Sequence, residues 1–395
     1  MQVLKNIRVI ELGQLIGGPF CGKTLGDFGA DVIRVESVNG GDPLRRWRLL
    51  KDGTSVWWQV QSKNKRSLAV DLHTGEGQEI VRRLVERADV VIENFTPGTL
   101  EKWGLGWDAL STINPRLVML RVSGFGQDGP YRDKPGFGAM AEAMGGLRYL
   151  TGEPGRIPVR TGTSIGDTLG ALHGAIGILL ALYHRDVNGG KGQVIDVALY
   201  EAVFNCMDSL LPEYSAFGIT REPAGSSLPG IAPSNAYRCA DGIVLIAGNA
   251  DSIFRRLMTT IGRTDLANDP TLAANDGRVA RAHEIDSAIS DWTLELSVKA
   301  ALCALDEAGV PASKIYTIED ISNDPHFRAR GMIQRIRTRA GFDLDIPGVV
   351  PRLSATPGAF RSAAPDLGAD TTEILLSHGF SPERIATLRR EKIIR

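Results

Sequence analysis

The first part of the chain alternates between apolar segments of strand length and segments of helix length. The first apolar run, IRVIEL, ends at Gly13, and a helix that opens at Pro19 would stop by Gly29. Such alternation predicts a mostly parallel sheet with helices on both faces. The predicted strands cover residues 7–12, 31–36, 89–92 and 117–122, and the predicted helices cover residues 19–29 and 75–88.

The later part of the chain predicts a second, smaller unit. A long apolar helix is expected over 167–184, where Asn188 and two glycines follow it. Beyond about residue 205 the chain becomes rich in Pro, Gly and Ser, as a linker between units is. The further predicted elements are strands 193–197, 236–238 and 243–246 and helices 251–261, 281–294, 299–308 and, last, 371–378.

Charge and cysteine content exclude several classes of function. Forty-five Lys and Arg against 46 Asp and Glu give a net charge of −1, without a run of like charge at either end, which disfavours nucleic-acid and membrane-surface binding. The four cysteines have no metal-ligand spacing, so neither a disulfide framework nor a metal site is expected. The N-terminus lacks a signal-peptide pattern, and we expect a cytoplasmic protein that acts on small molecules.

Glycine is the one unusual component: 45 of the 395 residues, about 11%, are glycine, against an average near 7%. Gly13, Gly17 and Gly18 lie between a strand and a helix, and Glu36 ends the next strand, as in a dinucleotide site. The spacing G-Q-L-I-G-G-P does not match G-x-G-x-x-G, and Pro19 lacks a backbone N–H for a pyrophosphate. A NAD or FAD site is therefore disfavoured.

A second motif surrounds Ser164, which lies at the centre of the letters G-x-S-x-G. No strand precedes it, so a serine-hydrolase elbow is disfavoured. Asp167 follows at the start of the apolar helix, either as a capping or first-turn acid that the helix dipole stabilises or as a carboxylate nucleophile. Periodicity alone leaves both interpretations of Asp167 open.

Several long motifs resemble one enzyme family. They are, in order, ELGQLIGGPF, GDFGADVIRVE, GGDPLR, NKRSLAVDL, VIENFTPGTLEKWGLGW, NPRLVMLRVSGFGQDGPYRDKPGF, IGDTLGALHGAIGILLALYHR and GGKGQVIDVALYEAV, followed late in the chain by PDLGAD. With these motifs the chain resembles the family III CoA-transferases of the CaiB/BaiF type over nearly its whole length. The resemblance implies transfer of CoA from an acyl-CoA to a free carboxylic acid.

The resemblance also implies the architecture. We expect an α/β fold with a Rossmann-like large domain built from both chain ends, an inserted smaller α/β domain, and an interlocked homodimer. The expected domain boundaries are 1–205 for the first part of the large domain, 206–233 for a linker and active-site loop, 234–323 for the small domain and 324–395 for the returning tail. Residues 224–233 stand where the family has a glycine-rich loop over the active site. That they form only a surface linker is an equally weighted interpretation.

By resemblance, Asp167 is the nucleophile. Its carboxylate would form a mixed anhydride with the donor acyl group and then an aspartyl-CoA thioester. Both intermediates are activated acyl compounds, so the reaction requires neither ATP nor metal. CoA and acyl-CoA are then substrates, and no permanently bound cofactor is expected.

The CoA contacts are carried over by motif position. The predicted set is Gln14, Leu15, Ile16, Gly17, Arg66, Asn94, Thr96, Pro97, Gly98 and Lys102. Basic side chains suit the CoA phosphates, although a solvated surface is the alternative for Arg66 and Lys102. Ser37 stands where some relatives carry an arginine, which Arg34 or Arg45 would have to replace.

Related racemases place a proton-transferring histidine ahead of the catalytic helix, where this chain has Phe137. A phenyl ring takes up no proton, so racemization is disfavoured. His173 lies inside the predicted helix and is interpreted as a core residue. A hydrolase on the same scaffold and a catalytically silent CoA-binding protein remain alternatives.

The substrate pair is predicted from nearby arginines. Arg160 and the cluster Arg45, Arg46 and Arg48 offer bidentate partners for a second carboxylate, and Phe137 is a further candidate substrate contact. We therefore expect succinyl-CoA or a similar dicarboxylyl-CoA as donor and a C4–C6 dicarboxylate or hydroxydicarboxylate as acceptor. For Arg160, a role in a structural ion pair is an equally weighted alternative. For Trp57 and Trp58, packing is the alternative to forming a wall of the acyl pocket.

Overall fold

The computed structural model describes residues 2–395, which divide into two compact units. Of the described residues, the larger unit contains 2–148, 161–208 and 326–395, so it is built from both the N-terminal and the C-terminal parts of the chain. The smaller unit contains residues 149–160 and 209–325. Residues 206–233, expected as a linker, contain a helix, α10 (Leu210–Phe217).

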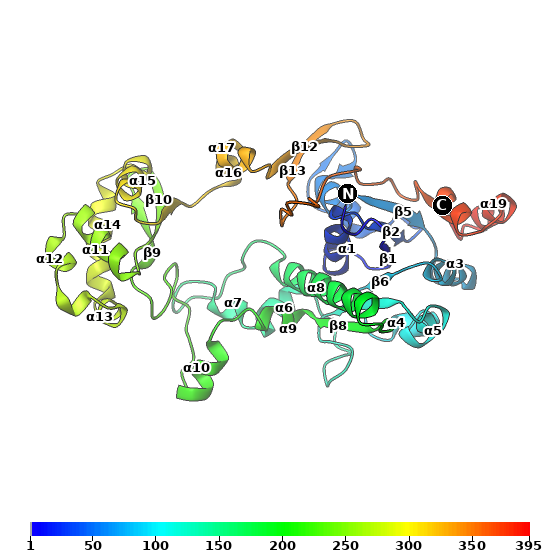
Figure 1. Cartoon of the computed structure of the whole chain (residues 1–395), viewed down its shortest axis with the longest axis horizontal. Coiled ribbons are helices and arrows are strands. Elements are labelled where there is room, and N and C mark those ends of the chain that lie inside the picture. The colour runs from blue at the N-terminus through cyan, green and yellow to red at the C-terminus, as the bar shows by residue number, and fades with distance from the viewer. Residues whose placement is uncertain (1) are drawn as a thin grey trace. The chain divides into compact units, whose positions relative to one another are not determined.

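A six-stranded sheet forms the centre of the larger unit (Figure 1). Its strand order is β5-β2-β1-β6-β7-β8, and every neighbouring pair is parallel. The predicted α/β class with a parallel sheet is therefore confirmed. The strands are β1 (Arg8–Glu11), β2 (Asp31–Glu36), β5 (Lys65–Ala69), β6 (Val90–Glu93), β7 (Val118–Ser123) and β8 (Val194–Ala198).

Alternate residues of the buried strands supply two hydrophobic cores, one on each face of the sheet. Val9 and Val90 face a core with α1 (Gly17–Asp27) and α8 (Ile165–Val187), and Ile10 and Val91 face the opposite core. This alternation is what a sheet buried on both faces requires. The helices of the second core are α3 (Gly75–Val85), α5 (Trp107–Ile113), α18 (Thr371–Ser377) and α19 (Pro382–Arg390).

The larger unit contains further short elements around this sheet. They are η1 (Pro43–Arg46), β3 (Leu50–Lys51), β4 (Thr54–Ser55), α2 (Val56–Gln61), α4 (Thr99–Lys102), α6 (Gly138–Met144), α9 (Leu199–Phe204) and the hairpin β12 (Ile333–Arg337) with β13 (Asp343–Pro347). Helices α7 (Leu147–Leu150) and α17 (Pro325–Ala329) lie where the chain passes between the units.

The smaller unit has an antiparallel sheet of order β11-β10-β9. Its strands are β9 (Ser234–Cys239), β10 (Gly242–Ala247) and β11 (Ala312–Lys314). Helices pack on this sheet around one hydrophobic core. They include α11 (Asp251–Thr260), α12 (Thr264–Ala267), α14 (Ala282–Leu294) and α15 (Val298–Glu307), with α13 (Asn275–Ala280), η2 (Pro270–Leu272) and α16 (Ile318–Asn323) nearby in sequence.

Helix α8 is long and apolar enough to cross a membrane by length and composition. The small residues of α8 let the helix approach the sheet closely, as in a helix that packs in a protein core. A Cβ added to Gly174 would lie 2.6 Å from Cδ2 of Leu120 on β7. The apolar character of α8 is therefore in part that of a core helix.

The structure decides one alternative and contradicts one prediction about the elements. Asp167 was expected at the N-cap or in the first turn of its helix, and it lies in the first turn, since α8 begins at Ile165 and its N-cap is Ser164. The helix over 371–378 was expected to be the last, yet α19 follows it. The strongly polar sequence of α19 hides the two residues that it buries, Ile385 and Leu388.

Candidate active site

The half-buried carboxylate of Asp167 lies in the first turn of α8, between two glycines that begin other helices. A Cβ added to Gly138, the first residue of α6, would lie 2.3 Å from Oδ2 of Asp167. A Cβ added to Gly17, the first residue of α1, would lie 3.8 Å from Oδ1. The carboxylate thus lies directly against main chain, at the N-terminal end of α8, where the helix dipole is positive.

The turn between β1 and α1 is fixed to the end of β6 by one amide side chain. Asn94 Oδ1 accepts a hydrogen bond from the N–H of Gln14 at 2.7 Å, and Asn94 Nδ2 donates to the carbonyl of Gln14 at 2.9 Å. Gly13 permits this contact, because a Cβ there would lie 2.4 Å from Oδ1 of Asn94. The structure therefore brings together the predicted residues Gln14–Gly17, Asn94 and Asp167.

The loop after Asn94 leads through Thr96, Pro97 and Gly98 into the short helix α4. A buried ion pair holds its base, since Arg121 Nε donates to Glu93 at 2.7 Å and Arg121 Nη1 donates to Glu101 at 2.7 Å. Burial raises the pKa of Glu93, although Arg121 acts in the opposite direction. Lys102 ends α4 and is exposed.

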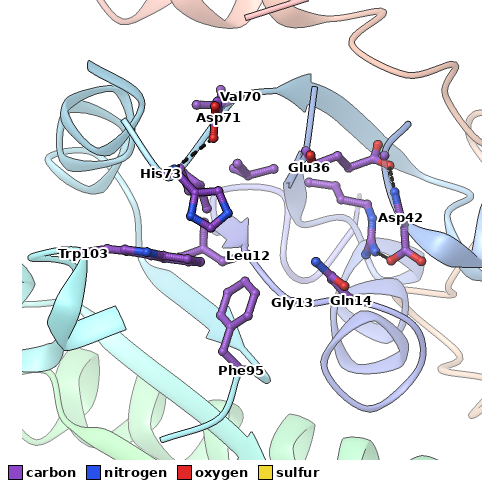
Figure 2. A pocket seen from close by; sticks show the side chains of 15 residues that line it. Leu12, Gly13, Gln14, Glu36, Asp42, Val70, Asp71, His73, Phe95 and Trp103 are labelled. Carbon is purple, nitrogen blue, oxygen red and sulfur yellow. Dashed lines mark hydrogen bonds and ion pairs between the residues drawn. The ribbon is translucent and has the colours of Figure 1, made fainter. Parts of the chain in front are cut away.

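A pocket opens beside Gln14 at the carboxyl ends of the strands (Figure 2). One wall is aromatic: the rings of Phe95 and Trp103 meet edge to face at 5.3 Å, and those of His73 and Trp103 at 5.4 Å. Figure 2 shows Gln14 and Asp42 on the other side. Carboxyl ends of parallel strands are where open α/β sheets bind ligands, and the pocket offers both stacking and polar contacts.

Sequence reasoning missed part of this pocket. Asp71, Leu72, His73 and Trp103 line it, and so does Ser37. The first three follow β5, which was not predicted because it is a short edge strand that begins with Lys and Arg. An expected strand at 65–69 would have placed residues 71–73 at the same sheet edge as Gln14 and Glu36.

A cluster of buried charges forms part of the pocket wall, since Arg34 and Asp42 both line the pocket. Arg34 forms ion pairs with Glu11 and Asp42, and Lys65 Nζ lies 2.8 Å from Oε2 of Glu11. Burial lowers the pKa of Lys65 to about 8, although Glu11 acts in the opposite direction. Arg34 is 1% exposed, so this predicted substitute for the missing arginine is held inside the protein.

Arg45, a predicted substrate contact, forms an ion pair inside this chain. Its Nη2 and Nε lie 2.7 and 2.8 Å from the carboxylate of Glu36, and its guanidinium lies over the ring of Trp58 at 3.7 Å. Trp58 is 1% exposed and donates to the carbonyl of Pro365 at 3.3 Å, so Trp58 serves packing.

Arg66, a predicted CoA contact, lies on β5 and binds both oxygens of Asp31 at 2.7 Å. It is not among the residues that line the pocket. Phe137 precedes α6 as its N-cap and is 64% exposed. Arg160 is exposed and belongs to the smaller unit. His173 Nδ1 lies 2.9 Å from the carbonyl of Leu169, one turn earlier in α8.

Within residues 2–395, no group of three or more His, Cys, Asp or Glu side chains is arranged to hold a metal ion. The cysteines Cys21, Cys206, Cys239 and Cys303 are free.

Comparison with known proteins gives matches over nearly the whole chain. Residues 4–371 match the sequence model of CoA-transferase family III. Succinyl-CoA–D-citramalate CoA-transferase of Chloroflexus aurantiacus is 48% identical over 394 residues, which cover 99% of this chain and 98% of that relative. The beta subunit of succinyl-CoA–L-malate CoA-transferase from the same organism is 43% identical over 397 residues, which cover 99% and 98%.

The solved structures include similar folds. A crystal structure of a CaiB/BaiF family protein from Brucella suis matches with a TM-score of 0.84 and 36% sequence identity. The match covers 95% of this chain and 99% of that one.

Proposed function

The chain belongs to CoA-transferase family III, and from this we propose that it moves CoA from succinyl-CoA to a second dicarboxylic acid through Asp167. The observation that carries the proposal is the position of the Asp167 carboxylate against the main chain of Gly138 and beside Gly17. A carboxylate in this position can act as the nucleophile on a thioester carbonyl and form a covalent acyl intermediate.

The proposed reaction is a sequence of acyl exchanges. The Asp167 carboxylate attacks the thioester carbonyl, and the C–S bond breaks. CoA departs as the thiolate, and a mixed anhydride of Asp167 and succinate remains. The thiolate then attacks the aspartyl carbonyl, which releases succinate and forms an aspartyl-CoA thioester. The acceptor carboxylate attacks that thioester, and the freed thiolate takes the acceptor acyl group from the new anhydride. Asp167 is regenerated, and no group outside the substrates is consumed.

For CoA we propose the pocket beside Gln14, with its nucleotide end near the aromatic wall of Phe95 and Trp103. Aromatic faces suit stacking of a base, and the main chain at Gln14–Gly17 leads from the pocket to Asp167. The predicted contacts stay proposals: Gln14, Leu15, Ile16, Gly17, Asn94, Thr96, Pro97, Gly98, Lys102 and Arg66, of which Arg66 would have to exchange Asp31 for a phosphate.

For the acceptor we propose a C4–C6 dicarboxylate or hydroxydicarboxylate. The two similar relatives are named for D-citramalate and L-malate, both hydroxydicarboxylates, with succinyl-CoA as the donor. Arg160, seven residues before Asp167, is the proposed partner of the second carboxylate, with Phe137 as a wall. Arg45 is the second candidate, and its guanidinium is paired with Glu36 in the structure.

We propose that two copies assemble into an interlocked homodimer, with the small domain at 234–323 inserted between parts of the large domain. Helix α8 supports assembly because it exposes a row of large apolar side chains, which monomers seldom leave uncovered. They are Leu172, Ile176, Leu179, Leu180 and Tyr183, each at least 40% exposed. The four free cysteines fit a reducing cytoplasm.

Transfer is tested by incubating the purified chain with succinyl-CoA and a panel of acids, and following new thioesters by mass spectrometry. L-malate, D-citramalate and glutarate should form CoA thioesters, and butyrate should not. Asp167→Asn, which keeps the side-chain shape and removes the nucleophile, should lower the rate at least about a thousandfold. Hydroxylamine should convert the wild-type intermediate into a hydroxamate on the peptide that contains Asp167.

The matched control is Asp291→Asn, an exposed aspartate on α14, which should transfer CoA at the wild-type rate. Free thiol released without an acceptor would indicate a hydrolase instead. Activity with butyrate alone would contradict the dicarboxylate assignment, and full activity of Asp167→Asn would contradict the nucleophile.

A further inference from the structure

The turn before α1 contains a backbone conformation that its residue type disfavours. Leu15 has φ of +62°, in the left-handed region that glycine adopts freely and residues with a Cβ seldom do. This residue lies between Gln14, which Asn94 holds, and Gly17, which faces Asp167. A strained residue persists only where its surroundings hold it, and such residues gather at functional sites.

One buried carboxylate holds Leu15. The N–H of Leu15 donates to Oδ2 of Asp42 at 2.9 Å, and the same oxygen pairs with the buried Arg34. Oδ1 of Asp42 accepts the N–H of Leu44 at 2.6 Å, at the start of η1. Asp42 is 2% exposed. Both of its oxygens therefore accept hydrogen bonds from fixed donors.

Arg34 is held in turn from the other side. Glu11, at the end of β1, pairs with Arg34 and with Lys65, so three strands anchor the cluster through β1, β2 and β5. The contact from Asp42 to Leu15 thus connects the rigid sheet to the turn that faces Asp167. On the opposite side of the turn, Asn94 makes the equivalent connection to the end of β6.

We propose that Asp42, supported by Arg34, is a positioning residue that holds Leu15 in its left-handed conformation and thereby fixes the Gln14–Gly17 segment against the Asp167 carboxylate. This inference rests on the proposed CoA transfer at Asp167. Asp42 contacts the main chain of Leu15 and Leu44 and the side chain of Arg34, and it lines the pocket proposed for CoA without contacting Asp167 in any hydrogen bond described above. Its effect is therefore expected on the rate of the chemical steps and not on folding alone, since small misplacements at a reacting centre are costly.

The test is a set of double-mutant cycles at Asp42 and Leu15. Asp42→Asn offers one acceptor where the carboxylate offers two, so the amide cannot serve Leu15 and Leu44 together. We expect it to lower kcat about 10- to 100-fold at saturating succinyl-CoA and acceptor. In a Leu15→Gly background, where the left-handed conformation is unstrained, Asp42→Asn should lower kcat by less than about 3-fold.

Leu15→Ala is the matched background, because alanine loses the same side-chain bulk but retains the strain of a Cβ at positive φ. There Asp42→Asn should keep its full effect on kcat. Asp27→Asn removes another carboxylate that is 2% exposed, at the far end of α1, where it pairs with Lys63. Asp27→Asn should lower the unfolding midpoint while kcat stays within about twofold of the wild type, since it touches no part of the turn.

Equal losses in the Gly and Ala backgrounds, or an equal kcat loss in Asp27→Asn, would overturn the positioning role. Amide hydrogen exchange separates this inference from the proposed function. Asp42→Asn should speed exchange at the peptide that contains residues 14–17, and Asp27→Asn should not. A wild-type chain that transfers no CoA would refute the function, and unchanged exchange at 14–17 in Asp42→Asn would refute the positioning of Leu15.

Discussion

At the scale of single residues, the site depends on what Gly138 lacks. The Asp167 carboxylate occupies the space in which a side chain at 138 would lie, with Oδ2 2.3 Å and Cγ 2.7 Å from an added Cβ. Neither atom is the end of a long flexible chain, since an aspartate has only two side-chain torsions. Either the carboxylate or the start of α6 would have to move to admit a methyl group.

Gly138→Ala should therefore reduce transfer about 10- to 100-fold, through displacement of the nucleophile. The measurement is kcat with succinyl-CoA and L-malate, together with the yield of hydroxamate on Asp167. Gly75→Ala is the control, because Gly75 begins α3 with open space around its Cβ position and no positive φ. A Gly138→Ala enzyme as fast as Gly75→Ala would show that the carboxylate can shift without loss.

At the scale of elements, α19 shows how a helix with a polar sequence contributes to the core. Ile385 and Leu388 lie one turn apart and are 3% and 1% exposed, packed with α18 on one face of the sheet. Leu388→Ala should lower the free energy of unfolding by about 2–4 kcal/mol, because it leaves a cavity. Arg384→Ala, on the exposed side of the same helix, should change it by less than about 0.5 kcal/mol. Urea unfolding measures both, and equal effects would contradict the packing of α19.

The elements that could be predicted from sequence are those whose apolar pattern is continuous. DVIRVE gave β2 its full bounds, and the long apolar run gave α8 to within a few residues. The edge strand β5 was missed because it begins with two charged residues, Lys65 and Arg66, and the helix α19 was missed because charged residues fill its exposed positions. Because this strand was missed, Asp71, Leu72 and His73, three of the 15 residues that line the pocket, were not foreseen. Asp167 and Asn94 came from motifs, whereas the role of Asp42 needed the backbone angle of Leu15.

At the scale of the whole molecule, the C-terminal tail of the chain is bound to the N-terminal part of the larger unit. Arg361 donates to main-chain oxygens of Gly26 and Ala30, and the N–H of Arg361 donates to Asn64 at 2.6 Å. Further along, His378 ends α18 with Nε2 3.5 Å from Nη1 of Arg8 on β1. The tail thus completes the larger unit through polar contacts as well as through the core.

This contact predicts a dependence of stability on pH. Burial lowers the pKa of His378 from 6.5, and the charges of Arg8, Arg87 and Arg66 act in the same direction, against the hydrogen bond to Ile374. As pH falls through 6.5, the unfolded chain takes up a proton at this histidine before the folded chain does, so the unfolded state gains stability. The folded state should therefore lose stability below pH 6.5, until its own lower pKa is passed.

His378→Asn removes this titration while keeping a polar side chain. The wild type should exceed the variant in free energy of unfolding by more at pH 7.5 than at pH 5.5, measured by urea unfolding. The result would contradict a buried neutral imidazole if the wild-type advantage over His378→Asn stayed constant or grew on acidification. Protonation would then favour the folded state, in which His378 joins the tail to β1.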